Sequence, residues 1–185
     1  MNTTMVSEES TLRVALTGAP GTGKTTISAL LEGHYNVQAV RDLADACGAL
    51  GPVEDDGAHP IDVLHLVRHM ANMDGDMLVE GHLSHFLAPD AVVVLRCSPV
   101  QLQARLMSRG YSDTKVTANV EWELLGGVHA ELQDAGIDVP LLELDTSSSH
   151  PEALAQAILA WREGGYAQSV GPHIDWLADP GHLPS

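Results

Sequence analysis

Residues 18–25, Gly-Ala-Pro-Gly-Thr-Gly-Lys-Thr, decide the fold that this sequence predicts. They match the pattern Gly-x-x-x-x-Gly-Lys-[Ser/Thr] in full, which is the Walker A phosphate-binding loop. A short apolar run at residues 12–17 precedes the loop, and a helical pattern at residues 24–32 follows it. This motif binds phosphate when it lies between a buried strand and a helix. The stretch therefore predicts an α/β protein that binds a nucleotide.

Each residue type in the loop has a physical role in holding the phosphates of ATP. Glycines at positions 21 and 23 let the main chain turn its N–H groups inward and approach oxygens that a Cβ would block. The lysine supplies a cation to the β- and γ-phosphates, and the threonine after it is placed to ligate Mg²⁺. We therefore predict that ATP and Mg²⁺ bind at Gly21, Gly23, Lys24, Thr25 and Thr26, with Thr26 donating to the α-phosphate.

Strand-like and helix-like segments alternate along the rest of the chain. The further strands are expected at residues 35–40, 77–79, 91–97 and 141–144, and the further helices at residues 42–50, 61–73, 99–108, 113–133 and 151–163. This alternation predicts the three-layer α/β/α fold of P-loop NTPases, with a five-stranded parallel sheet between helices. Right-handed crossovers place the carboxyl ends of all the strands at one edge, where ligands bind.

An acidic residue and a histidine follow the strand expected at residues 77–79. P-loop enzymes use a second carboxylate at a strand end to hold Mg²⁺, usually through water, and Glu80 has this position. His82 could orient or deprotonate an attacking water, or donate a hydrogen bond to a phosphate. The alternative is that Glu80 caps a helix and His82 is an ordinary loop residue. His85 is expected to face solvent or to pack locally.

Composition limits the classes of function and the compartment. The net charge of −16 argues against general nucleic-acid binding, because phosphate backbones select basic surfaces, and it favours a solubilising surface. Cys47 and Cys97 lack metal-binding spacing, which indicates a reducing cytosol. Residues 1–10 are polar and acidic, unlike a signal peptide, and no apolar run approaches the roughly 18 residues that span a bilayer. We expect a soluble, cytoplasmic protein with no membrane partner.

The order of four motifs resembles the archaeal family whose members are called "putative adenylate kinases". The motifs are GAPGTGKTT, VEGHLSH, AVVVLRCSP and RLMSRGYSDTKVTANVEWE, and the last includes Asn119, Glu121 and Glu123. The likeness covers residues 12–161, which is most of the chain. These archaeal proteins are related to a eukaryotic nuclear adenylate kinase that also acts as an ATPase in maturation of the small ribosomal subunit.

The resemblance implies a division of the chain and a role for an arginine. It implies a nucleoside-monophosphate-kinase-like domain at residues 11–163, with a monophosphate-binding segment at 39–61, a short lid at 108–118 and a tail of unknown role at 164–185. Arg109 matches the lid arginine that contacts ATP, and such a residue could stabilise charge on the transferring phosphoryl group. The alternative is that Arg109 only caps the helix that ends there. Glu80 and His82 match the family's acidic-x-His motif.

The resemblance implies phosphoryl transfer from MgATP to AMP, with Lys24, Glu80, His82 and Arg109 as catalytic residues. Relatives have an arginine after an Asp-Leu-Ala run, where this chain has another residue, and Arg41 or Arg68 could replace it in binding the AMP phosphate. A second function is an ATPase switch that docks on a basic ribosomal protein of the small subunit, with water in place of AMP. A third is a kinase for another small molecule.

Overall fold

The computed structural model describes residues 12–54, 59–167, 173–178 and 181, and its centre is a parallel sheet of five strands. The strands are β1 (Arg13–Thr17), β2 (Asn36–Ala39), β3 (Met77–Glu80), β4 (Ala91–Arg96) and β5 (Leu141–Asp145). They lie in the order β2-β3-β1-β4-β5, and each neighbouring pair is parallel. The five-stranded parallel sheet expected from the sequence is confirmed.

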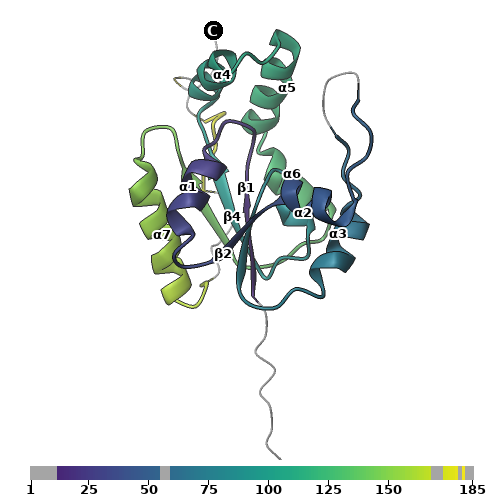
Figure 1. Cartoon of the computed structure of the whole chain (residues 1–185). Coiled ribbons are helices and arrows are strands. Elements are labelled where there is room, and N and C mark those ends of the chain that lie inside the picture. The colour runs from purple at the N-terminus through teal and green to yellow at the C-terminus, as the bar shows by residue number, and fades with distance from the viewer. Residues whose placement is uncertain (1–11, 55–58, 168–172, 179–180, 182–185) are drawn as a thin grey trace, which may run out of the picture.

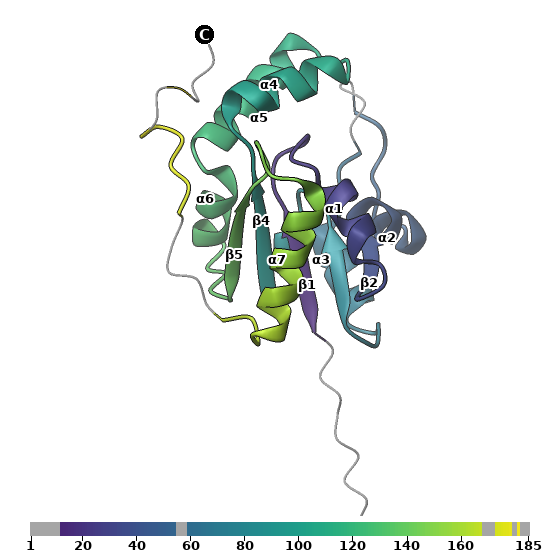
Figure 2. The ribbon, with the colours of Figure 1, turned by 90° about the vertical axis from the view of Figure 1, so that its left-hand side faces the viewer.

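Helices cover both faces of this sheet, as the sequence predicts. They are α1 (Lys24–Leu31), α2 (Val40–Cys47), α3 (Val63–Met70), α4 (Pro99–Ser108), α5 (Asp113–Leu124), α6 (Gly127–Asp134) and α7 (Pro151–Glu163), with the short 3₁₀ helix η1 (Ser84–Phe86). Figures 1 and 2 show α1 and α7 on one face and α2, α3 and α6 on the other, while α4 and α5 rise above the end of the sheet. Among the described residues, no helix combines the length and apolarity required to span a bilayer.

The strands alternate their side chains between two apolar layers, and β4 is buried along its whole length. Val14, Leu16, Val93 and Leu95 face α1 and α7, where they pack with side chains such as Ile158. The opposite layer holds two groups of buried side chains, one under α6 and one under α2 and α3. These groups are Ala15, Val92, Val94, Val128 and Leu132, and Val40, Leu43, Leu66, Met70, Met77 and Val79. Both faces are therefore closed by apolar packing.

The single helix expected at residues 113–133 is wrong, because two glycines divide it into α5 and α6. Gly126 has φ +67°, a left-handed conformation that glycine adopts at low cost. A Cβ on Gly127 would lie 2.1 Å from Cε2 of Trp122, so only glycine allows this close approach. The turn brings Trp122 against the start of α6.

The bounds of two other helices and one connection also differ from expectation. The helix expected at 42–50 begins at Val40 and ends at Cys47, because Gly48 has φ +73° and donates its N–H to the carbonyls of Ala44 and Asp45. The helix expected at 61–73 is shorter, and Asp62 accepts a hydrogen bond from the N–H of His65 at its beginning. The connection after β3 contains η1, which the sequence pattern did not predict.

The described part of the C-terminal tail packs against the domain. Trp176 is buried, and its Nε1 donates to Oε1 of Glu123 at 3.0 Å. The main-chain N–H groups of His173 and Ile174 donate to the carboxylate of Glu143 at 2.6 and 3.0 Å. These contacts join the tail to α5 and β5.

Candidate active site

The fold gathers the predicted site residues at the carboxyl ends of three elements, at the upper end of the molecule in Figure 1. The phosphate-binding loop follows β1, and β3 lies beside β1 with Glu80 opposite Leu16. Glu80 therefore ends its strand next to the beginning of the loop. Arg109 is the C-cap of α4, which rises from the end of β4.

The loop wraps around the N-terminus of α1, and glycines at two positions allow its conformation. Gly21 has φ +90°, and a Cβ there would come within 3.1 Å of Leu102 and 3.2 Å of Leu106 on α4. Gly23 has φ +96° and open space where its Cβ would be. Glycine is thus needed at position 21 for both its backbone conformation and its packing against α4, and at position 23 for its backbone conformation alone.

Lys24 lies at the first position of α1 and bends back over the loop. Its Nζ donates to the carbonyl oxygens of Gly18 at 2.8 Å and Ala19 at 2.9 Å. Burial lowers the pKa of Lys24 to about 8, against the opposing charge of Glu80. The ammonium group is held by neutral carbonyls in a poorly solvated place, where a phosphate would be a stronger partner.

Thr25 and Glu80, which the sequence predicts as Mg²⁺ ligands, lie together. The Thr25 hydroxyl donates to Oε1 of Glu80 at 3.3 Å. A hydroxyl and a carboxylate are the oxygen ligands that Mg²⁺ prefers, and this ion usually completes its shell with waters and substrate phosphates. The donor set therefore fits Mg²⁺. Thr26 follows on the exposed first turn of α1 and lines both pockets described next.

Arg109 lines two adjoining pockets on one side of the loop. A phosphate pocket of about 150 Å³ lies between the loop, Arg109 and Tyr111. A larger side pocket of about 390 Å³ extends from Gly21 and Thr26 past Arg109 to Pro151 and Leu154 on α7. Arg109 is exposed at a helix end that turns through Gly110, with φ +76°. The predicted lid is a short turn followed by the first part of α5.

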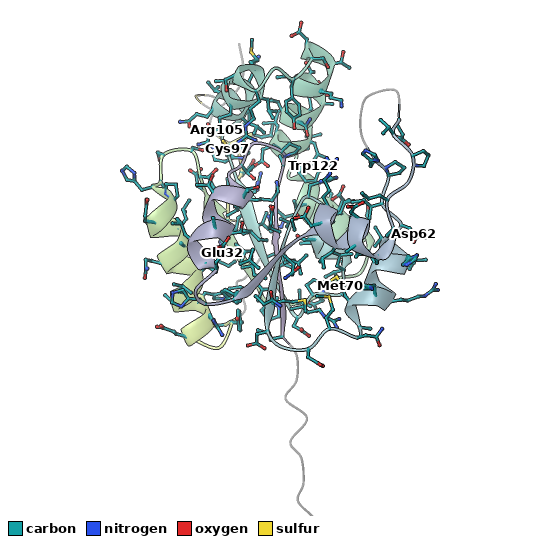
Figure 3. The ribbon with its side chains drawn as sticks, in the orientation of Figure 1. Glu32, Asp62, Met70, Cys97, Arg105 and Trp122 are labelled. Carbon is teal, nitrogen blue, oxygen red and sulfur yellow. The ribbon has the colours of Figure 1, made fainter. Side chains whose placement is uncertain are left out.

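Arg105 is a site residue that the sequence reasoning missed. Its guanidinium donates to the main-chain oxygen of Thr146 at 2.7 Å and to that of Gly21 at 3.3 Å, so it ties the loop to the end of β5. Figure 3 shows Arg105 and Cys97 together near the upper ends of the strands. Arg105 precedes Arg109 by one helical turn, and this i, i+4 spacing could have indicated a shared face.

His82 lines a third pocket, which shares Pro20 of the loop with the phosphate pocket. This α5 pocket, of about 300 Å³, is bounded by Pro20, His82, Ala118, Asn119, Trp122 and Glu131. Partial burial, with the charge of Lys24, lowers the pKa of His82. Its imidazole is therefore mostly neutral near pH 7 and able to accept a proton or a hydrogen bond.

Other residues that the sequence analysis considered do not line these three pockets. Arg41 and Arg68 are exposed on α2 and α3, and neither lines any of these three pockets. Residues 55–58 of the expected monophosphate-binding segment lie outside the described residues. Glu123 is buried in an ion pair with Arg96, and His85 is fully buried and packs against Phe86, which agrees with the second of its two expected positions.

This chain is similar in sequence to one family model and to several archaeal proteins that share one name. Residues 14–126 match the family described as "AAA domain". A "Putative adenylate kinase" of Archaeoglobus fulgidus is 39% identical over 171 residues, covering 90% of this chain and 92% of the relative. A second "Putative adenylate kinase", from Halobacterium salinarum, is 40% identical over 163 residues, covering 86% of this chain and 95% of the relative.

Solved structures show the same fold at low sequence identity. Shikimate kinase from Acinetobacter baumannii has a TM-score of 0.58 and 17% identity, covering 86% of this chain and 97% of that chain. Deoxyadenosine kinase from M. mycoides has a TM-score of 0.52 and 16% identity, covering 82% of this chain and 100% of that chain. The loop, the sheet order and the archaeal relatives agree, and the chain belongs to the archaeal P-loop family whose members are named "Putative adenylate kinase".

Proposed function

We propose that this protein is an adenylate kinase, which transfers a phosphoryl group from MgATP to AMP and yields two ADP. The observation that carries this proposal is that pockets with different linings meet at the loop. The phosphate and side pockets lie toward Arg109, and the α5 pocket lies toward His82; Pro20 of the loop lines both the phosphate pocket and the α5 pocket. A kinase needs space for a donor and an acceptor that meet at one phosphate site. The names of the archaeal relatives agree with this reaction.

The proposed roles of the residues follow from charge and position. ATP lies with its phosphates on the loop and its base in the side pocket, whose volume of about 390 Å³ is within the range of small-molecule sites. Lys24 binds the β- and γ-phosphates, and Arg109 adds positive charge as the lid, residues 108–118, closes. Bound Mg²⁺, held by Thr25 and through water by Glu80, would neutralise phosphate charge.

AMP is the proposed acceptor, bound between the segment at residues 39–61 and the α5 pocket. His82 lines that pocket and is proposed to hydrogen-bond the acceptor phosphate or an attacking water. No covalent intermediate is needed, because holding the two nucleotides in line supplies most of the rate increase. The site of action is proposed to be the cytoplasm.

A second candidate function is an ATPase switch in assembly of the small ribosomal subunit, as in the eukaryotic relatives that the motifs resemble. The net charge of −16 favours it, because an acidic surface attracts a basic ribosomal protein. Water would then take the place of AMP. In this case His82→Ala should reduce ATP hydrolysis more than transfer to AMP, and equal losses would argue against water orientation by His82.

One assay separates the two functions. Purified protein is mixed with MgATP, with and without AMP, and ADP is measured over time. The kinase proposal predicts ADP formation far above the rate with MgATP alone, and no such increase when AMP is replaced by adenosine. If AMP adds nothing, the kinase proposal is wrong and the ATPase function is favoured.

A further inference from the structure

His85 is a fully buried histidine whose two ring nitrogens both contact polar side chains. Nδ1 lies 2.9 Å from Oγ1 of Thr17, and Nε2 lies 2.9 Å from Oε2 of Glu131. The ring packs against Phe86, with 4.1 Å between the ring centroids. One imidazole thus connects the end of β1, the helix η1 and the helix α6.

Both partners of His85 contact or lie beside residues of the candidate active site. Thr17 immediately precedes the phosphate-binding loop, and its hydroxyl donates to the main-chain oxygen of His82 at 3.3 Å. Glu131 lines the α5 pocket together with His82, and it accepts a hydrogen bond from Trp122, another residue of that pocket. His85 therefore contacts one wall of the pocket directly and the other through Thr17.

We propose that His85 is a positioning residue, which holds His82 and Glu131 at the two walls of the α5 pocket. The proposal rests on the function proposed above, because it assigns His82 to the acceptor side of the reaction. His85 itself is fully buried, so it acts through Thr17 and Glu131 and not on the substrate.

Counting protons shows why a polar side chain is required at each place. Thr17 has one hydroxyl proton, and when it is donated to the His82 oxygen, Nδ1 of His85 must carry the proton of their shared contact. The contact at Nε2 takes its proton from the group that carries one: a neutral carboxyl group donates to Nε2, and a doubly protonated ring donates to the carboxylate. Burial lowers the pKa of His85 to about 4 and raises that of Glu131, and each direction favours the uncharged form of that group.

This proton arrangement gives matched variants for each partner. Thr17→Ser keeps the hydroxyl, whereas Thr17→Val keeps the shape and removes it. Glu131→Gln offers Nε2 both an N–H donor and an oxygen acceptor, so it keeps the hydrogen bond in either case, whereas Glu131→Leu cannot form one. His85→Phe would remove the ring nitrogens, but it can also fail to fold, so the test uses the four variants at the partners.

The first measurement is steady-state transfer to AMP, with thermal unfolding to confirm that each variant is folded. Thr17→Val and Glu131→Leu should lower kcat about ten- to a hundredfold, the effect of a small displacement of a reacting group. Thr17→Ser should stay close to wild type, Glu131→Gln should keep a clearly higher kcat than Glu131→Leu, and KM for ATP should stay unchanged in all four. Equal kcat values within each pair, or losses confined to KM for ATP, would overturn the proposal.

The second measurement does not depend on activity. The ¹³C resonance of the His82 main-chain carbonyl reports its hydrogen bond, and it should shift in Thr17→Val but not in Thr17→Ser. An unmoved resonance in Thr17→Val would overturn the proposal even if activity falls. If the wild type transfers nothing to AMP, the proposed function fails separately, and the same variant pattern is then measured on ATP hydrolysis.

Discussion

The molecule contains two clusters of charge at the carboxyl ends of its strands, and they differ in how the charges are satisfied. In the Arg96 network (Arg96, Glu123, Glu143 and Trp176), the guanidinium lies 2.6 Å from a carboxylate oxygen of each glutamate. Arg96 and Glu123 are 2% and 1% exposed. In the phosphate-binding loop, by contrast, Lys24 donates to two neutral carbonyls and Arg109 is exposed. The first cluster is closed by its own partners, and the second is open to a ligand.

The pKa shifts of Glu143 and Lys24 show the same difference between the two clusters. Burial alone would raise the pKa of Glu143, but hydrogen bonds from His129, His173 and Arg96 outweigh it and lower the pKa to about 2. Burial lowers the pKa of Lys24 to about 8, because Glu80 only partly compensates. The closed cluster therefore stabilises its charges within the fold, while the described hydrogen bonds of the Lys24 ammonium group go to neutral carbonyls, which an anion could replace. The closed cluster should therefore control folding, and the loop should control activity.

The largest expected effect is the loss of activity in Lys24→Ala. Removing the cation from the loop should lower kcat/KM for ATP at least about a thousandfold, because it acts on the transferring phosphoryl group. The free energy of unfolding, measured in urea, should change by less than about 1 kcal/mol, since the lysine has no buried carboxylate to leave unpaired. Turnover close to wild type would refute the proposed site.

The next largest effect is the loss of stability in Arg96→Met. Removing one partner of a buried ion pair typically costs about 3–5 kcal/mol, because the remaining charge is buried alone. The double variant Arg96→Met with Glu123→Gln should recover part of this loss, since it removes that charge. A urea unfolding series measures both. A cost below about 1 kcal/mol for Arg96→Met would contradict the role of the closed cluster.

Arg109→Ala should affect activity without affecting folding. Its guanidinium lines the phosphate pocket from an exposed position, so kcat should fall about ten- to a hundredfold while stability stays within about 0.5 kcal/mol. Glu163→Ala is the control, because Glu163 is also exposed at the end of a helix, α7, but lines none of the three pockets. Equal kcat values for the two variants would leave Arg109 as only a helix cap.

The smallest expected effect is a change with pH in the cost of Glu143→Gln. The folded pKa of Glu143 lies below its ordinary value of 4.5, so its ionised form stabilises the native state at pH values above 4.5. This contribution is lost as the pH falls toward the folded value of about 2. The difference in unfolding free energy between wild type and Glu143→Gln should therefore shrink from pH 7 to pH 4. A constant difference would show that charge is not what Glu143 contributes.

The sheet could be predicted from the sequence because its signals are local. Residues 91–95 of β4 are continuous and apolar, as a central parallel strand must be, and Pro99 begins the helix after it. The loop residues and Glu80 could be placed because parallel strands end at the same edge. These features depend on neighbours in the chain or on a general rule of topology.

Two features that the sequence analysis did not predict in full depend on contacts between distant residues, whereas a third is local. The local one is the break between α5 and α6, where Trp122 approaches Gly127, and the adjacent glycines at positions 126 and 127 could have indicated it. The burial of His85 depends on Glu131, 46 residues later in the chain. The packing of Trp176 depends on Glu123, 53 residues earlier. No local pattern marks such pairs, so only the folded arrangement reveals them.

The most direct test of the open site is a crystal structure with Mg²⁺ and a non-hydrolysable ATP analogue. We predict phosphate oxygens within hydrogen-bond distance of the main-chain N–H groups of residues 21–25. We also predict that Nζ of Lys24 leaves the carbonyls of Gly18 and Ala19 for the β- and γ-phosphates. A structure with the nucleotide bound elsewhere, and Lys24 still on those two carbonyls, would contradict the account.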